Sequence, residues 1–192
     1  ETDGIPTNNE TVLHSLRVYA FVDGQPAGHF YTKDGLDVNN PSFLMHLTMY
    51  STMTQKVDFY VVANEAAMET PGSSVLLTEN TTETQLNHFT FTKLNTSKGL
   101  PMFCKQTETI DLTQLSDKTP ADPGHAGHTL LRQDLTFELK RPIGKLGVFA
   151  AKPVGENSSL RVTGLTVLAS GTRTRNYLMP QTDETLKAIT GI

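Results

Sequence analysis

The fold class is decided by the stretch Leu16-Arg17-Val18-Tyr19-Ala20-Phe21-Val22. One alternating set of positions is aliphatic, and the other holds Arg17, Tyr19 and Phe21, which is the period of two of a β-strand. Both sets are largely apolar, so we expect both faces of this strand to be covered. Asp23-Gly24 follows directly and predicts a tight turn into a hairpin partner over residues 28–31.

The same period of two recurs along the rest of the chain. We expect strands over residues 43–49, 57–63, 88–92, 107–112, 131–140, 145–151 and 160–169. A change of phase at Gly164 predicts a β-bulge. No stretch predicts a helix longer than two turns. The pattern predicts an all-β fold, a β-sandwich of about seven strands with only short helical turns.

Composition agrees with a β-rich globular domain. The 192 residues include 28 Thr and no Trp, and threonine favours strands over helices. The net charge is −4 and no block of like charges occurs. A nucleic-acid-binding domain would need clustered Lys and Arg for its phosphate contacts, so we expect no nucleic-acid partner. No apolar run approaches the length of a membrane span.

The sequence contains no motif that carries catalysis or holds a cofactor. It has no phosphate-binding loop, no Gly-x-Ser-x-Gly elbow and no His-Glu-x-x-His pair, so we expect neither an enzyme nor a cofactor. Cys104 follows Met102 and Phe103, and we expect its thiol to be buried and unreactive. His125 and His128 lie in a Gly-rich loop without another ligand pair nearby, so an exposed loop without metal is expected.

Several of these segments resemble, in order, those of the fimbrillin superfamily of Bacteroides-type fimbriae. The segments that carry the resemblance are 16–24, 57–64 (ending in Ala63-Asn64), 99–102 (Gly-Leu-Pro-Met), 135–146, 160–167 and 175–180. Together they span residues 13–180. Within the superfamily, the chain is most similar to the branch of fimbrial anchors and minor fimbrial subunits.

The resemblance implies a domain organisation and a location. Residues 1–12 would be a polar tether, and residues 13–178 an N-terminal fimbrillin-like β-sandwich of transthyretin-like or immunoglobulin-like type. Residues 179–192 would be a tail leading towards a second β-sandwich domain that is absent from this chain. The location implied is the cell surface, in a fimbrium or the outer membrane of a Gram-negative bacterium, with a lipid upstream of Glu1 as the attachment.

The function implied by the resemblance is that of a non-enzymatic structural subunit of cell-surface fimbriae. Such a subunit would be an anchor, minor or tip component and would take part in fimbrial assembly and cell adhesion. Its partners would be other fimbrial subunits, joined by β-strand addition, and a host or bacterial surface receptor. We expect the first strand to be the assembly element, with Leu16, Val18, Ala20 and Val22 as its residues. Because Arg17 lies inside this strand, we do not expect proteolytic activation there.

An alternative hypothesis is a surface β-sandwich module that binds a glycan or a host protein. A glycan platform needs exposed aromatic rings on which sugars can stack. Since the chain has no Trp, the candidates for this role are Tyr19, Tyr31, Tyr50, Tyr60 and Tyr177.

Overall fold

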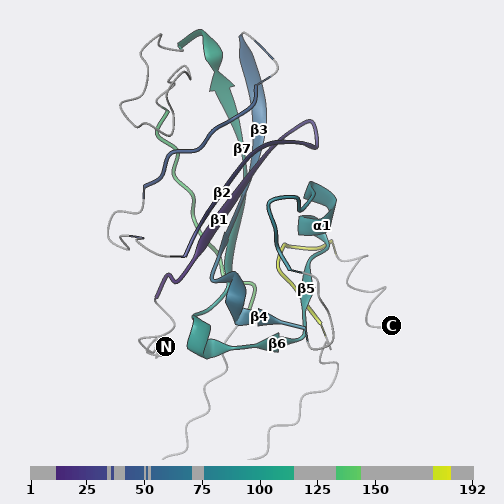
Figure 1. Ribbon diagram of the computed structural model, residues 1–192. Coiled ribbons are helices and arrows are strands. Elements are labelled where there is room, and N and C mark those ends of the chain that lie inside the picture. Colours follow the sequence, from purple (N-terminus) through teal and green to yellow (C-terminus); the bar gives the residue numbers. More distant parts are fainter. Residues whose placement is uncertain are drawn as a thin grey trace, which may run out of the picture.

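The computed structural model describes residues 12–33, 36, 42–49, 51, 53–70, 76–114, 133–143 and 175–182. Within these residues the protein is mostly β and is built around one four-stranded antiparallel sheet of order β2-β1-β3-β7 (Figure 1). Its strands are β1 (Leu16–Val22), β2 (Gln25–Thr32), β3 (Thr54–Ala63) and β7 (Met102–Asp111). The helical elements described are α1 (Glu83–Asn87) and the 3-10 turns η2 (Glu65–Ala67), η3 (Thr96–Lys98) and η4 (Leu112–Gln114). The prediction of an all-β fold with short helical turns is confirmed.

The β1–β2 hairpin forms where the sequence predicts it. Asp23 and Gly24 have φ angles of 50° and 76°, the pair of positive values that a type I′ turn requires. Ala20 pairs with Gly28 and Phe21 pairs with Pro26, so Ala27 is an extra residue in a β-bulge. The bulge turns the carbonyl of Ala27 outward, where it accepts a hydrogen bond from Thr48 N at 2.7 Å.

Two hydrophobic clusters lie on opposite faces of the sheet, and β1 contributes to both. The first core cluster consists of Leu16, Val18, Ala20, Val22, Ala27, Val57, Phe59, Val61, Ala63, Cys104, Ile110 and Leu112. The second core cluster consists of Tyr19, Phe21, Tyr60, Val62, Met68, Leu77, Leu86, Phe91, Phe103, Leu178 and Met179. Because successive side chains of a strand point to opposite faces, all seven residues of β1 are buried.

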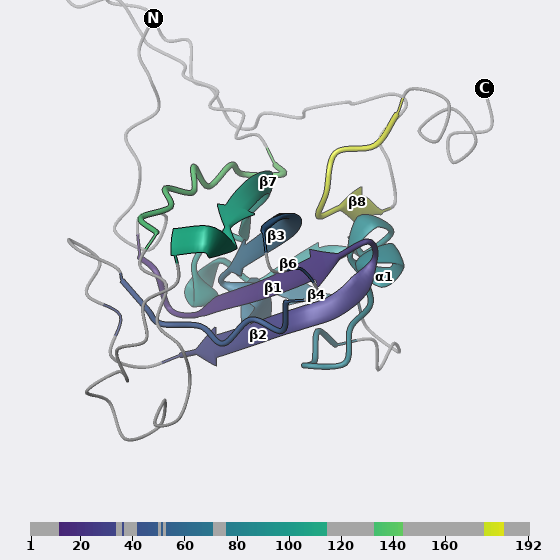
Figure 2. The same ribbon diagram turned by 90° about the horizontal axis from the view of Figure 1, so that it is seen from above.

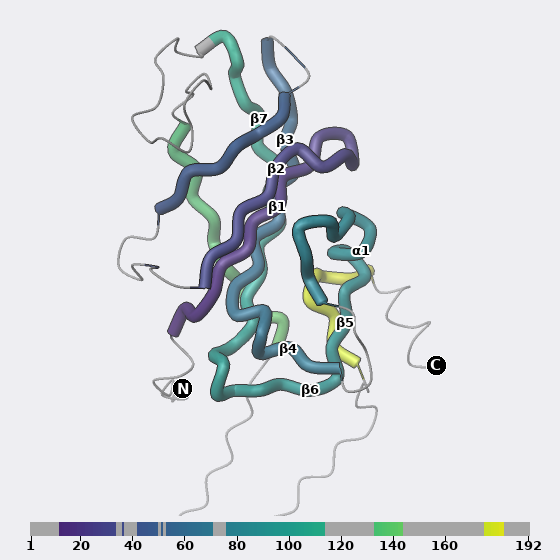
Figure 3. Tube along the Cα trace, in the orientation of Figure 1, coloured from purple at the N-terminus to yellow at the C-terminus, as the bar shows by residue number. Residues whose placement is uncertain are grey.

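The first core cluster is covered by two extended segments, 42–49 and 133–140, which lie on one side of the sheet in Figure 3. Phe43 stacks on Phe30 with ring centroids 4.6 Å apart, and Phe137 lies 5.5 Å from Phe59. This second layer makes the architecture a sandwich-type fold.

The main chains of these two segments are only sparsely hydrogen-bonded to the sheet. Segment 42–49 makes the Thr48–Ala27 bond, and Lys140 exchanges two bonds of 2.7 and 2.8 Å with Phe103. We predicted regular strands over 43–49 and 131–140. The alternation is present in the described residues, but the main chains of these segments make only isolated bonds to the edge strands β2 and β7 and form no continuous ladder with them.

The crossing of segment 42–49 over β2 depends on Gly28. A Cβ atom at this position would lie 2.4 Å from the carbonyl oxygen of His46 and 2.8 Å from the Met45 side chain. A side chain at position 28 would therefore force the covering segment off the sheet.

The second core cluster is covered by α1 and by short strands: β4 (Met68–Glu69), β5 (Thr90–Phe91), β6 (Lys93–Leu94) and β8 (Asn176–Tyr177). β4 pairs with β6, and β5 pairs with β8, which brings two distant parts of the chain together. Beyond this cover the same face is polar, with exposed Lys56 and Thr107. The predicted strands over 145–151 and 160–169, the bulge at Gly164 and the tether lie outside the described residues, apart from Val12.

Asn64 connects three segments at the end of β3. Its backbone is left-handed, with φ of 55°, and its side chain is completely buried. The side-chain oxygen accepts from His14 N at 2.7 Å, and Nδ2 donates to the carbonyls of Val12 and Leu100, each at 2.9 Å. Gly99 allows this arrangement, because a Cβ there would lie 2.6 Å from Nδ2 of Asn64. The side-chain amide of Asn64 therefore hydrogen-bonds to main-chain groups of the segment that precedes β1 and of the segment that precedes β7.

We predict that Asn64→Ala lowers the free energy of unfolding by about 3 kcal/mol or more, because it leaves buried main-chain groups unpaired and because alanine tolerates the left-handed region less well than asparagine does. Asn64→Gly removes the same hydrogen bonds but tolerates the positive φ, so it should be about 1 kcal/mol less harmful. Urea unfolding of both variants measures this. A loss below about 1 kcal/mol for Asn64→Ala would contradict the role assigned to this side chain.

Candidate functional site

The predicted assembly residues lie on one face of the central strand. Leu16, Val18, Ala20 and Val22 all belong to the first core cluster, and each is at most 5% exposed. β1 is hydrogen-bonded to β2 on one edge and to β3 on the other. The structure thus brings the four side chains together as an apolar row in the interior of the sheet. Their part in assembly stays a prediction.

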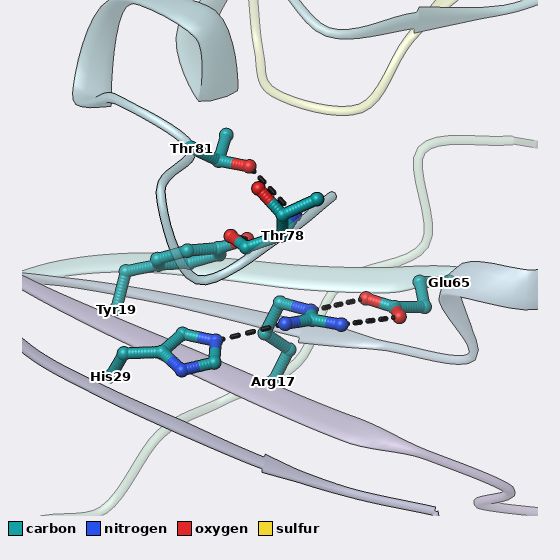
Figure 4. A network of polar contacts seen from close by, with 6 residues as sticks. All are labelled: Arg17, Tyr19, His29, Glu65, Thr78 and Thr81. Carbon is teal, nitrogen blue, oxygen red and sulfur yellow. Dashed lines mark hydrogen bonds and ion pairs between the residues drawn. The ribbon is translucent and has the colours of Figure 1, made fainter. Parts of the chain in front are cut away.

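Arg17 is a buried charge on the opposite face of the same strand. Its guanidinium donates to both carboxylate oxygens of Glu65, through Nε at 2.6 Å and Nη2 at 2.8 Å (Figure 4). Burial lowers the pKa of Arg17, but its hydrogen bond and ion pair with Glu65 outweigh that effect and raise it overall. Arg17 is 7% exposed and lies inside the paired strand β1. The expectation that this position is not a proteolytic activation site stays a prediction.

The same guanidinium orients two aromatic side chains of β2. Nη1 lies 2.9 Å from Nε2 of His29, and the guanidinium carbon lies 3.9 Å from the ring centroid of Tyr31. Arginine can only donate, so Nε2 of His29 must accept and Nδ1 must carry the proton of the neutral imidazole. Burial and the positive charge of Arg17 lower the pKa of His29, which keeps this neutral form.

A pocket of about 320 Å³ opens beside His29. Its lining includes Tyr19, His46, Thr48, Glu79 and Thr81. The Tyr19 ring lies 5.1 Å from the His29 ring, and its hydroxyl donates to the carbonyl of Thr78 at 2.7 Å. Thr78 N in turn donates to Oγ1 of Thr81 at 2.8 Å, so hydrogen bonds hold the loop that closes one side of the pocket (Figure 4).

A second polar cluster fixes α1 on the sheet. The hydroxyl of Tyr60 donates to Glu83 at 2.7 Å and lies 3.1 Å from Oδ1 of Asn87. The amine of Lys105 lies 4.8 Å from the centre of the Tyr60 ring and 3.8 Å from Glu83. Burial, together with the neighbouring Glu83, raises the pKa of Tyr60. These contacts dock a helix, and they include no group poised for proton transfer.

Among the candidate sugar-stacking tyrosines, only Tyr31 is an exposed large aromatic residue in the described part of the chain. It is 40% exposed, whereas Tyr19 and Tyr60 are 2% and 0% exposed. Tyr177 is half-buried in β8, and Tyr50 lies outside the described residues. Sequence reasoning identified Tyr31 as one of five candidates, but it could not foresee that Arg17 supports the ring.

A fimbrial protein is among the solved structures that are similar to this chain. No family model and no curated protein matches this chain. A similar solved structure is the crystal structure of a fimbrial assembly protein from Parabacteroides distasonis. The two chains are 16% identical, with a TM-score of 0.44, and the match covers 71% of this chain. It covers 48% of the other protein, so the chain spans about half of that protein's length.

No cluster of three or more His, Cys, Asp or Glu side chains in the described ranges has the geometry to hold a metal ion. His125 and His128 lie outside those ranges. None of the helices that the structure describes combines the length and the apolar character needed to cross a membrane.

Cys104 lies in β7 and belongs to the first core cluster. It is 8% exposed, and its thiol donates a hydrogen bond to Oε1 of Gln106 at 3.9 Å. Burial raises the pKa of the thiol, so the reactive thiolate is suppressed. The expectation that Cys104 is buried is confirmed.

We predict that a disulfide reagent labels native Cys104 at least about 100-fold more slowly than it labels the urea-unfolded chain, because reaction requires local opening. A cysteine introduced by Thr84→Cys on the exposed surface of α1 provides the accessible reference in the same chain, with Cys104→Ala as the background. Equal labelling rates for the two positions would show that the face of β7 bearing Cys104 is open.

We predict that His29 makes stability depend on pH. The folded pKa lies below the ordinary value of 6.5, so the unfolded chain binds the proton first as the pH falls. The stabilisation is complete above about pH 6.5 and is lost as the pH falls through the folded pKa. Denaturant unfolding across this range should show the loss. His29→Gln keeps an acceptor for Arg17 without titrating, so this variant should lack that component; an unchanged pH profile would contradict the assignment.

Proposed function

We propose that this chain is a non-enzymatic structural subunit of a cell-surface fimbria, as an anchor, minor or tip component that joins other subunits by β-strand addition. Two findings support the proposal. The sequence resembles fimbrillins in a series of ordered segments that span residues 13–180, and the described residues form the all-β sandwich-type fold which that resemblance implies.

The observation that carries the proposal is the outer edge of β7. Phe103 N and O both bond to Lys140 and therefore point away from β3. The N–H and C=O groups of successive residues point alternately to the two edges of a strand. The main-chain groups of Lys105, Thr107 and Thr109 therefore also point away from β3. In the described residues their one hydrogen-bond partner is the Gln133 side chain, which donates to Thr109 O at 3.5 Å.

An edge of this kind accepts an extended strand. Unpaired N–H and C=O groups supply the main-chain bonds of β-augmentation, while side-chain pockets supply specificity. In the described residues, segment 133–140 bonds to this edge at Phe103 through Lys140 and at Thr109 through the Gln133 side chain, so an added strand would not have to displace a complete ladder. In this proposal the added strand extends the four-stranded sheet at β7. The apolar row on the inner strand β1 then belongs to the core beneath the extended sheet, and it consists of Leu16, Val18, Ala20 and Val22.

The test is Thr107→Pro, with fibre incorporation as the readout. Proline at this position removes an outward N–H and the side-chain hydrogen bond to Asp58, but no main-chain bond to β3. Edge strands tolerate the loss of an outward N–H, and the proline blocks an incoming strand. We expect the variant to fold and to be lost from fimbriae purified from the native host. Immunogold labelling of an epitope-tagged chain shows whether the parent protein lies on the fibres at all.

Two control variants separate blocking from damage. Thr107→Val also removes the side-chain hydrogen bond to Asp58 but keeps the N–H, so it should incorporate normally. Gln106→Pro removes an N–H that points to β3 and should destabilise the fold. If Thr107→Pro folds and enters fibres as well as the parent chain, the β7 edge is not the assembly edge; if the parent chain is absent from fibres, the fimbrial function itself is wrong.

A further inference from the structure

We propose that segment 133–140 is a strap that closes along the outer edge of β7 as an additional strand, and thereby controls whether this edge accepts a strand from another subunit. The control over assembly rests on the proposed function, because it takes β7 as the assembly edge. The closure itself is argued from contacts within the chain. Three features carry it: a register that is already set, side chains that match in that register, and opposing forces on the strap.

The register of closure is set at one end of the strap. Lys140 and Phe103 exchange two main-chain hydrogen bonds of 2.7 and 2.8 Å in an antiparallel bridge. Antiparallel pairs that exchange both bonds recur at every second residue, so this one bridge specifies how the rest of the strap would pair with β7. The next such pairs in this register are Lys105–Glu138, Thr107–Thr136 and Thr109–Asp134.

Two contacts further along the strap fit the same register. Gln106 pairs with Phe59 within the sheet, and the register places Phe137 opposite Gln106 on the other side. The rings of Phe137 and Phe59 lie 5.5 Å apart, so the middle of the strap is already in the matching row. At the far end, the Gln133 side chain donates to the carbonyl of Thr109 at 3.5 Å, and the register places Gln133 opposite the residue that follows Thr109.

The side chains match in this register on both faces. On the polar face, Lys105 would lie directly opposite Glu138, and Thr107 opposite Thr136. Opposite charges and paired threonines at such positions stabilise neighbouring strands. On the other face, the apolar residues of the strap keep the side on which they already pack against the first core cluster, so no side chain has to change face. These apolar residues are Leu135, Phe137 and Leu139.

Opposing forces act on the strap. Apolar contacts draw it over the first core cluster, whereas closure would give main-chain partners to the outward N–H and C=O groups of β7. Both arrangements keep the bridge between Lys140 and Phe103, which serves as the hinge. An added strand needs the same outward groups of β7 that the closed strap would use, so it can pair only while the strap is open.

Closure is tested with a disulfide between Glu108→Cys and Leu135→Cys in the Cys104→Ala chain. In the closed register these residues form a non-hydrogen-bonded pair with Cα atoms about 4.5 Å apart, a distance that a disulfide spans. We expect this disulfide to form under mild oxidation at least about tenfold faster than in the control that pairs Glu108→Cys with Thr136→Cys, whose side chains would lie on opposite faces. Equal rates in the two chains would overturn closure in this register.

Thr136→Pro gives a second, independent measurement. Thr136 is exposed, and in the closed register its N–H points to β7, so proline removes a bond that closure makes. Amide hydrogen exchange at Lys105, Thr107 and Thr109, followed by NMR, should be at least about threefold faster in this variant than in the parent chain. Thr136→Val keeps the N–H and should exchange as the parent does. Urea unfolding shows whether each variant folds, and unchanged exchange in folded Thr136→Pro would show that the strap does not close.

The control over assembly is measured by fibre incorporation in the native host. An edge that is open more of the time accepts strands more often, so Thr136→Pro should enter fimbriae at least about twofold more than the parent chain, with Thr136→Val at the parental level. Incorporation of Thr136→Pro at or below the parental level would overturn control by the strap. If the parent chain is absent from fibres, the proposed function and this control fail together, whereas cross-linking and exchange still decide whether the strap closes.

Discussion

The guanidinium of Arg17 is buried in the inner strand β1, and its positive charge requires a partner from the surrounding structure. Arg17 lies inside β1 and is removed from water, so it needs a carboxylate of matching geometry. Glu65 supplies that carboxylate from η2, 48 residues further along the chain. The chain reaches η2 directly after β3 by way of the left-handed backbone of Asn64. The same asparagine binds the chain entering β1 and the carbonyl of Leu100, so the Arg17–Glu65 pair and the Asn64 amide together tie β1, β3 and the approach to β7.

The sequence alone was sufficient to predict those parts of the fold that depend on interactions between neighbouring residues. The alternation of residues 16–22 and the Asp23-Gly24 turn predicted β1 and its hairpin with β2, because both signals act between neighbouring residues. The capping box between Thr82 and Gln85, which begins α1, could also have been read from the sequence, but we did not use it. By contrast, the partner of Arg17 could not be read, because many carboxylates were equally suitable until the fold brought Glu65 to it. The same holds for the pocket beside His29, which is formed by segments from three separate parts of the chain.

Alternation alone also could not distinguish a strand in a sheet from an extended segment lying over one. Segments 42–49 and 133–140 have the period of two and turn their apolar side chains inward, as strands do. Their main chains nevertheless make few bonds to the sheet, and most of the contacts are made by side chains such as Phe43 and Phe137. Whether such a segment pairs at an edge or covers a face depends on how closely its main chain can approach the strand beneath it. At β2 this close approach is possible because residue 28 is glycine.

The strand order gives the two edges of the sheet different properties. β2 and β7 lie at opposite edges (Figure 2), with β1 and β3 between them. At the β2 edge, the bulge at Ala27 bonds to segment 42–49 and the side chains of His29 and Tyr31 contact Arg17, so this edge is engaged by the chain's own residues. At the β7 edge, main-chain groups between Lys105 and Thr109 point outward, which suits the addition of another strand. Because these two edges lie on opposite sides of the sheet, a strand added at β7 would leave the contacts at the β2 edge unchanged.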